Sequence, residues 1–318
     1  MSKISARTLY ILLLALITGA ILGTKDTWNW LDSEVYYGYL TKSIILSYEE
    51  ILTQPDFGFY LILKSLNIVG LSAPQIWMLI ATITGILTFT STQQRTNNFL
   101  IFLMLYFSLY AWLHIYIQIR AALALSIFLT AIFAVKHPLP RTILFAISIS
   151  IHMSIAIPLI AFLSANKIQI NKKNLPYILI LICLPVALIS TYSLPFLPIN
   201  RILVYRELLA EGEHSYINLF SALPAIQLAT LSYIAINKNT TTACATAEYK
   251  MALIGTLCFY SFISIPVIAQ RAWEMLSVIF ILLLSRHYYK SKVLTTLTIM
   301  YFMFSLKSCY PLLLSPSQ

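Results

Sequence analysis

One apolar stretch constrains the fold more than any other part of the chain. Residues 99–135 contain only three strongly polar side chains, those of His114, Gln118 and Arg120. A single helix of that length would be about 55 Å long, whereas the hydrocarbon core of a bilayer is about 30 Å thick. The stretch therefore predicts two membrane spans, residues 98–116 and 117–135, joined by a turn near residues 112–120.

The composition extends this prediction to the whole chain. Of its 318 residues, 59% are hydrophobic and 10% are charged, and the mean hydropathy is +0.81. Such values exclude an ordinary soluble domain and predict an all-α, polytopic integral membrane protein. The net charge of +10 would suggest a nucleic-acid partner in a soluble protein. Here we interpret the positive charge as a sign of membrane topology, because Lys and Arg collect on cytoplasmic loops. The expected partner is therefore the lipid bilayer and not nucleic acid.

The apolar stretches together predict about nine transmembrane helices in a single transmembrane domain, residues 1–318. The predicted spans are residues 8–23, 75–91, 98–116, 117–135, 175–192, 216–236, 251–269, 275–285 and 293–314.

Three segments between these spans are predicted to be external. Residues 25–74 should lie partly in the membrane interface, because their apolar part, residues 57–71, is short for a span and contains Lys64. Residues 193–215 should form an external loop, and residues 270–274 a tight external turn.

The apolar segment 142–163 conflicts with the charge pattern when it is read as one span. A single span would place the basic residues of 167–173 outside and the acidic loop 193–215 inside, against the positive-inside tendency. A re-entrant helical hairpin that enters and leaves on the cytoplasmic side removes the conflict, and His152 then lies at its tip. Irregular backbone at that depth is tolerated only against protein or a water-filled cavity. In this topology the N-terminus is cytoplasmic, and the cytoplasmic loops hold most of the Lys and Arg with one acid, Glu248.

Four arginines of the external side are candidates for binding an anion: Arg120, Arg201, Arg206 and Arg271. Arginine presents a planar fork of donors that suits phosphate oxygens, so these residues predict a site for a lipid phosphate or pyrophosphate. The alternatives are pairing with external acids and snorkelling to lipid head groups. Arg120 has no acid near it in sequence, which favours a ligand, whereas Arg271 can pair locally with Glu274. We expect Arg120 and Arg271 to approach each other at a shared cavity.

Two titratable residues are candidates for catalysis. His152 could act as a base or donate a hydrogen bond to substrate, and the alternative is a packing histidine. Asp32 could be a base, or an acceptor of a hydrogen bond, at an attacking hydroxyl. The alternative is an ordinary external acid.

The chain lacks the sequence patterns of nucleotide-binding and metal enzymes. There is no P-loop, Rossmann glycine pattern, HExxH, GxSxG or DxD-type acid cluster. The four cysteines have no CxxC or ligand-like spacing, so neither a zinc site nor a disulfide framework is predicted. No cofactor is expected, and the energy for any group transfer should reside in an activated, lipid-linked donor.

Several short blocks, in order along the chain, carry a resemblance to a known family. The blocks are Asp32 to Tyr36, Gln54 to Phe59, Arg120 to Ala124, Ile151 to Ser154, Asn200-Arg201 and Gln270-Arg271. They resemble the EpsG-type, Wzy-like polymerases of O-antigen and exopolysaccharide in bacterial inner membranes, and the Arg120 and His152 blocks are the most specific. Gln54 stands where that family has an acidic residue before the proline.

The resemblance implies a glycosyltransferase that works at the periplasmic face without metal or nucleotide. It would transfer a growing glycan from undecaprenyl pyrophosphate to the non-reducing end of the next lipid-linked unit. The implied partner is an undecaprenyl-pyrophosphate-linked oligosaccharide, and a chain-length regulator protein is a further candidate. The candidate catalytic residues are Asp32 and His152, and the candidate substrate-binding residues are Arg120, Arg201, Arg206, Gln270, Arg271 and Glu274.

Two other functions are weighed against polymerisation. A non-catalytic transporter or flippase of lipid-linked glycans would call for a cavity open to each side in turn, commonly in a repeat-built fold. The chain shows no internal repeat, and its polar residues gather on one face. A polysaccharide-modifying acyltransferase would be expected to carry a histidine near the first span, and no histidine precedes His114.

Overall fold

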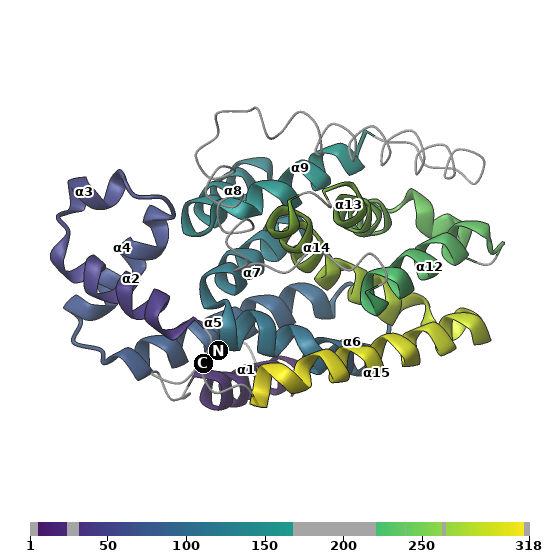
Figure 1. The fold of residues 1–318 in the computed structure, drawn as a ribbon, viewed down its shortest axis with the longest axis horizontal. Helices are drawn as coiled ribbons and strands as arrows, with labels where there is room; N and C mark the ends of the chain where they lie inside the picture. The colour runs from purple at the N-terminus through teal and green to yellow at the C-terminus, as the bar shows by residue number, and fades with distance from the viewer. Residues whose placement is uncertain (1–5, 24–31, 168–220, 239, 263–264, 315–318) are drawn as a thin grey trace. The chain divides into compact units, whose positions relative to one another are not determined.

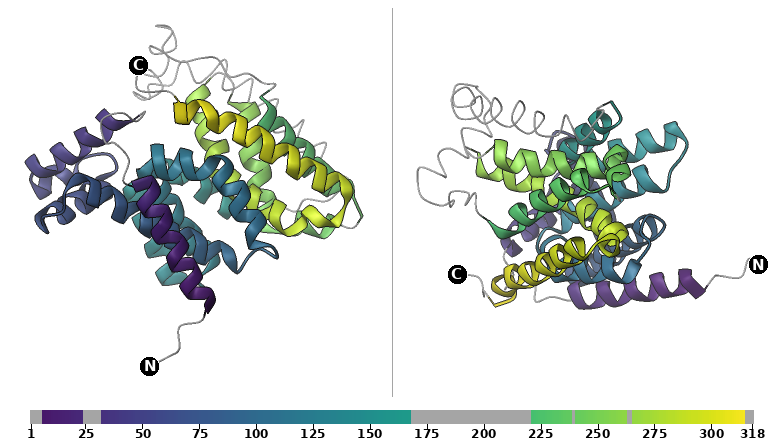
Figure 2. Two further views of the ribbon diagram at one scale, coloured as in Figure 1. Left: turned by 90° about the horizontal axis from the view of Figure 1, so that it is seen from below. Right: turned by 90° about the vertical axis from the view of Figure 1, so that its right-hand side faces the viewer.

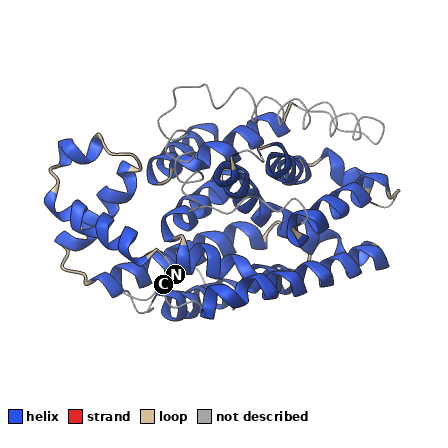
Figure 3. Cartoon of the chain, viewed as in Figure 1, coloured by secondary structure: helices blue, strands red, loops and turns tan. Residues whose placement is uncertain are grey.

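The computed structural model describes residues 6–23, 32–167, 221–238, 240–262 and 265–314. Within these ranges every regular element is a helix (Figure 3), which bears out the all-α prediction. The chain divides into two compact units, residues 1–156 with 305–318 and residues 157–304. We describe each unit by itself, and their placement in a single transmembrane domain stays a prediction.

The first unit is built on the close packing of α1 (Ala6–Gly23) against α5 (Ala73–Gln93), which lie side by side (Figures 1 and 2). Small residues on α1 permit this approach. A Cβ atom on Gly19 would lie only 3.1 Å from the Cα atom of Thr82 on α5, so a larger residue at position 19 would push the two helices apart.

The long apolar stretch forms two helical segments that meet at Gln118. The first consists of α6 (Phe99–Leu105) and the π-helix η1 (Tyr106–Ile117), and the second is α7 (Ile119–Phe133). Gln118 leaves the helical region, with φ −102° and ψ 55°. The predicted break near residues 112–120 is therefore confirmed, and it places Arg120 in the first turn of α7.

The predicted interfacial segment contains three short helices, α2 (Ser33–Ile45), α3 (Tyr48–Leu52) and α4 (Phe57–Ile68), which lie together in Figure 1. Lys64 on the apolar α4 has a structural partner. Its Nζ donates to the carbonyl oxygens of Ser43 at 3.2 Å and Leu46 at 2.6 Å. The lysine thus satisfies carbonyl groups at the end of α2, which have no partner within that helix.

The segment 142–163 is broken at its predicted middle. Helix α8 (Pro138–Ile151) is followed by His152, whose backbone is extended with φ −152° and ψ 109°. A short 3-10 turn, η2 (Met153–Ile155), then leads into α9 (Ala156–Ala165). The division into two half-helices at His152 is confirmed. The boundary between the units follows at Ala156, so the re-entrant hairpin stays a prediction.

In the second unit the structure corrects the predicted turn at residues 270–274. Helix α13 (Ala247–Ser261) ends well before it, and α14 (Pro266–His287) runs through it without interruption. Pro266 occupies the start of α14, where its missing N–H is no loss and its fixed φ suits a helix. The preceding residue, Ile265, is kept out of the α-helical region, with φ −131° and ψ 77°. The chain therefore turns before Pro266, and Gln270, Arg271 and Glu274 are helical.

The remaining elements of the second unit are also helices. They are α12 (Ala222–Ile236), the 3-10 turns η4 (Thr241–Ala245) and η5 (Tyr288–Lys290), and the first part of α15 (Lys292–Leu314), whose residues from Ser305 onward belong to the first unit. Among the described residues, four helices are long and apolar enough to cross a membrane: Ala73–Gln93, Phe99–Ile117, Pro266–Lys290 and Lys292–Tyr310. The count of nine spans stays a prediction. The predicted span 175–192 and the whole loop 193–215 fall within 168–220, outside the described residues.

Candidate functional site

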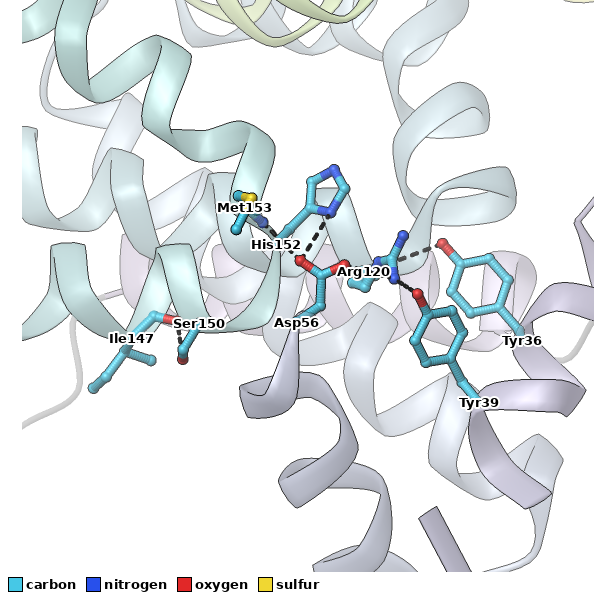
Figure 4. Close-up of polar contacts among 8 residues, drawn as sticks. All are labelled: Tyr36, Tyr39, Asp56, Arg120, Ile147, Ser150, His152 and Met153. Carbon is cyan, nitrogen blue, oxygen red and sulfur yellow. Dashed lines mark hydrogen bonds and ion pairs between the residues drawn. The ribbon is translucent and has the colours of Figure 1, made fainter. Parts of the chain in front are cut away.

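Three side chains from distant parts of the sequence meet in the first unit: Asp56, Arg120 and His152 (Figure 4). The Asp56 Oδ2 atom lies 3.0 Å from Nη1 of Arg120. The Oδ1 atom accepts a hydrogen bond of 2.8 Å from the backbone N–H of Met153, and it lies 3.9 Å from Nδ1 of His152. We call these three side chains the Asp–Arg–His cluster. It joins three of the sequence blocks that carried the family resemblance.

Asp56 occupies a special backbone position at the start of α4. Its φ of 60° and ψ of 34° lie in the left-handed region, and it is the only residue other than glycine with a positive φ in the described part of the chain. Aspartate tolerates this region better than most residues. The conformation starts α4, because the Asp56 carbonyl accepts the Phe59 N–H at 2.9 Å, while the side chain serves the cluster.

Helix α2 supplies two tyrosines to Arg120. The Arg120 guanidinium lies over the Tyr39 ring, 4.5 Å from its centroid, and Nη1 donates to the Tyr39 hydroxyl. The Tyr36 hydroxyl accepts the backbone N–H of Arg120 at 3.3 Å. This N–H belongs to the first turn of α7 and has no acceptor within its own helix. A cation over an aromatic face is stabilised by the ring quadrupole, so α2 fixes both the backbone and the side chain of Arg120.

Further aromatic side chains pack against these two tyrosines. Tyr36 packs edge-on against Phe59 and Trp77, with ring centroids 6.1 and 6.0 Å apart, and Tyr39 lies 4.9 Å from Tyr60. Water is therefore partly excluded from the cluster. The side chains of Arg120, Asp56 and His152 are only 17%, 7% and 12% exposed, and charges interact more strongly in such surroundings than in water.

A close approach of two helices brings Asp56 to the break at His152. A Cβ atom on Gly58 would lie 2.9 Å from the carbonyl carbon of Ser150, which is closer than real Cβ contacts allow. Helix α4 can therefore pass α8 at this distance only because residue 58 is glycine. The Ser150 hydroxyl donates to the Ile147 carbonyl at 2.8 Å, so it is satisfied within α8.

Of the predicted catalytic residues, His152 lies in the cluster, whereas Asp32 lies at the N-cap position of α2, one turn before Tyr36. Its side chain makes no capping hydrogen bond, and its carbonyl accepts the N–H of Tyr36 at 3.1 Å. The helix that reaches Arg120 thus begins at Asp32. Arg201 and Arg206 lie outside the described residues.

The other predicted binding residues form a local arrangement on α14, in the second unit. The Gln270 side-chain amide donates to Glu274 at 3.0 Å, and Nη1 of Arg271 lies 3.5 Å from the Glu274 carboxylate. Glu274 is buried, whereas the Arg271 side chain is 36% exposed. The local ion pair considered from the sequence is therefore present. The expected approach of Arg271 to Arg120 would join the two units and stays a prediction.

Sequence reasoning did not include Asp56 among the site residues. It noted that Gln54 replaces the family's acidic residue and that Arg120 has no acid near it in sequence. The acid that pairs with Arg120 stands two positions after Gln54, in the same block, and 64 residues before Arg120. The signal was the presence of a carboxylate in a block already recognised as part of the resemblance.

No group of three or more His, Cys, Asp or Glu side chains suited to a metal ion occurs among the residues that the structure describes. The chemistry that the cluster itself offers is a guanidinium, an imidazole and a carboxylate in a partly dry environment. A guanidinium has five N–H donors in a fixed fork, which suits the oxygens of a phosphate group.

The sequence model of the EpsG family matches residues 9–311, nearly the whole chain. No curated protein and no solved structure matches the chain.

Proposed function

The chain belongs to the EpsG family, and on that premise we propose that it is a polysaccharide polymerase of the bacterial inner membrane. The proposed reaction transfers a glycan from undecaprenyl pyrophosphate to the non-reducing end of another lipid-linked repeat unit, at the periplasmic face. The observation that carries the proposal is Arg120, a partly buried guanidinium held over Tyr39 beside His152.

The reaction needs a cation where the leaving group departs. A hydroxyl oxygen of the acceptor sugar attacks the anomeric carbon of the donor, and the bond from that carbon to the pyrophosphate oxygen breaks. The electron pair leaves with undecaprenyl pyrophosphate, so negative charge grows there in the transition state. Donors placed at that position in advance stabilise the transition state more than the ground state. Arg120 is the proposed donor, and its fixed position over Tyr39 suits this role.

The proton of the attacking hydroxyl requires an acceptor. Asp32 is the proposed base, since it stands at the start of the helix that carries Tyr36 and Tyr39. His152 is the proposed hydrogen-bond donor toward the pyrophosphate or its supporting groups. Arg271, with Gln270 and Glu274, is proposed to bind the same substrate, and so are Arg201 and Arg206.

The test compares Arg120→Ala and Arg120→Lys in cells that lack the chromosomal gene and carry it on a plasmid. We expect Arg120→Ala to abolish long polysaccharide and leave single repeat units. Arg120→Lys keeps the charge but loses the fork, so it should give short or sparse chains. Normal long polysaccharide from Arg120→Ala would show that Arg120 is not the donor that stabilises the leaving pyrophosphate.

The matched control is Arg95→Ala in the same unit. Arg95 also lies over an aromatic ring, 5.3 Å from the centroid of Phe133, and donates to the Phe133 carbonyl at 3.4 Å. It has no part in the Asp–Arg–His cluster, so its removal should leave the length of the polysaccharide unchanged.

The same cells distinguish a polymerase from the transporter alternative. Loss of a polymerase leaves lipid-linked units accessible to a periplasmic glycosidase, whereas loss of a flippase leaves them inaccessible.

A further inference from the structure

We propose that Asp56 is the positioning residue of this site, whose two carboxylate oxygens hold Arg120 and the break at His152–Met153 in one arrangement. The inference rests on the proposed function. It gives a role to an acidic residue that neither the sequence analysis nor the family match assigns to the site.

The two oxygens of Asp56 hold two different elements. Oδ2 pairs with the guanidinium on α7 at 3.0 Å, and Oδ1 accepts the Met153 N–H at 2.8 Å. The residues joined by the second bond are 97 positions apart in sequence. A single carboxylate therefore fixes the distance between a cation in the first turn of one helix and the break between two others.

The break itself needs an acceptor at this point. Helix α8 ends at Ile151, and Met153 begins the 3-10 turn η2, so its N–H is one of the donors that a helical start leaves without an internal partner. A partly buried N–H of this kind must find an acceptor elsewhere. Asp56 supplies this acceptor. The bond fixes the backbone next to His152 and thereby the point from which the imidazole side chain extends.

The guanidinium likewise needs a carboxylate. Arg120 is only 17% exposed on its side chain, and a partly buried cation is costly unless an anion compensates it. The Tyr39 ring and hydroxyl help to orient the guanidinium, but neither carries a formal charge. Asp56 is thus both the counter-charge and the link to His152.

A different role for Asp56 makes the opposite prediction. Asp56 could act as an internal competitor that occupies Arg120 until a phosphate displaces it. Removal of the negative charge would then tighten the binding of phosphate, whereas removal of a positioning residue weakens it. The closeness of Gly58 to Ser150 favours positioning, because it keeps Asp56 at the break by backbone packing.

The first experiment measures binding of radiolabelled undecaprenyl pyrophosphate by the purified full-length chain in detergent. The variants are Asp56→Asn, Arg120→Gln and the double variant. Asp56→Asn keeps an oxygen for the Met153 N–H and loses the charge. We expect Arg120→Gln to weaken binding about tenfold in the wild-type background but less than about threefold in the Asp56→Asn background, because residues in contact are coupled.

The second experiment uses Met153→Pro, which removes the N–H that Asp56 accepts and otherwise replaces a side chain that is exposed. Proline is tolerated at a helical start, and the preceding His152 is already extended. We expect lipid binding to change by less than about threefold, because Arg120 keeps its carboxylate. The polymerisation rate should fall by about a hundredfold, because misplacement of about 1 Å in an active site has costs of that size.

The outcomes separate the two proposals. If the wild-type chain binds no undecaprenyl pyrophosphate, the proposed function is overturned, and the role of Asp56 falls with it. If the wild type binds and the effects of the two substitutions are additive, the function stands and the positioning role of Asp56 is overturned. Tighter binding by Asp56→Asn, or normal polymerisation by Met153→Pro, would also overturn it.

Discussion

The two units each contain an arginine paired with a buried carboxylate, but the two pairs are built differently. Arg271 and Glu274 lie three residues apart on α14, 3.5 Å from each other, and the arginine is 36% exposed. Arg120 and Asp56 come from different helices, lie 3.0 Å apart, and are 17% and 7% exposed. A local pair needs only its own helix, whereas a pair between elements depends on the fold around it. The second kind can place a charge where no single helix could hold it.

The largest expected difference is in stability. Arg120→Ala leaves the Asp56 carboxylate without its cation in a partly dry place, and breaking a buried pair costs about 3 kcal/mol of unfolding free energy. Arg271→Ala removes a partly exposed arginine, and the buried Glu274 keeps the hydrogen bond from the Gln270 amide at 3.0 Å, so the loss should be smaller, about 0.2–1 kcal/mol. Unfolding of the two variants in the same detergent measures both. Equal losses would remove the distinction between the pairs.

His152 tests whether the cluster acts on the substrate or only packs. A hydrogen-bond donor can be replaced in part by an amide, so His152→Asn or His152→Gln should keep some polymerisation while His152→Ala loses most of it. General acid–base catalysis contributes about 10²–10⁴-fold, so a base role predicts that all three variants lose activity equally. Polysaccharide chain length measures the difference, and wild-type length in all three variants would identify a packing residue.

The third prediction concerns the packing that supports the interhelical pair. Gly58→Ala should destabilise the first unit by about 1–3 kcal/mol, because the added methyl group overpacks the contact with Ser150. Gly38→Ala on α2 is the matched control, since nothing lies within 4 Å of its Cβ position. The control should be neutral or stabilising by up to about 1 kcal/mol, because alanine favours a helix. The idea fails if the two variants unfold alike.

The smallest expected effects concern Tyr39. Tyr39→Phe keeps the ring under Arg120 and loses the hydroxyl that Nη1 contacts, at a cost of about 1 kcal/mol. Tyr39→Leu also loses the ring, for a further loss of about 0.5–1 kcal/mol. Phe133→Leu beneath the exposed Arg95 is the control for a cation over a ring outside the cluster. If Tyr39→Leu equals Tyr39→Phe in unfolding free energy, the ring contributes nothing to holding Arg120.

The same contrast explains what the sequence could predict. The break at Gln118 was predicted from the length of an apolar stretch, which is a local property. The division at His152 was predicted from the conflict between a single span at 142–163 and the charges of the loops around it. The turn at residues 270–274 was predicted wrongly, because charged side chains were taken as the sign of a turn. Pro266 was the better sign, since a proline constrains the backbone while a charged residue is tolerated in a helix whose neighbours pair with it.

The candidate site was predictable only in part. Arg120 and His152 were recognised as polar residues in apolar surroundings, and the Arg271–Glu274 pair follows from helical spacing. Asp56 was missed, because its pairing depends on how α4 passes α8, and that approach is set by Gly58 and Ser150 from blocks far apart in sequence. Contacts of this kind follow from tertiary packing, so the block around Gln54 showed a carboxylate but not its partner.

The most direct measurement is an experimental structure of the full-length chain with undecaprenyl pyrophosphate bound. The account predicts a phosphate oxygen about 2.7–2.9 Å from a guanidinium nitrogen of Arg120, with Asp56 still accepting the Met153 N–H. A pyrophosphate bound elsewhere on the chain, with the Asp–Arg–His cluster out of its reach, would contradict it.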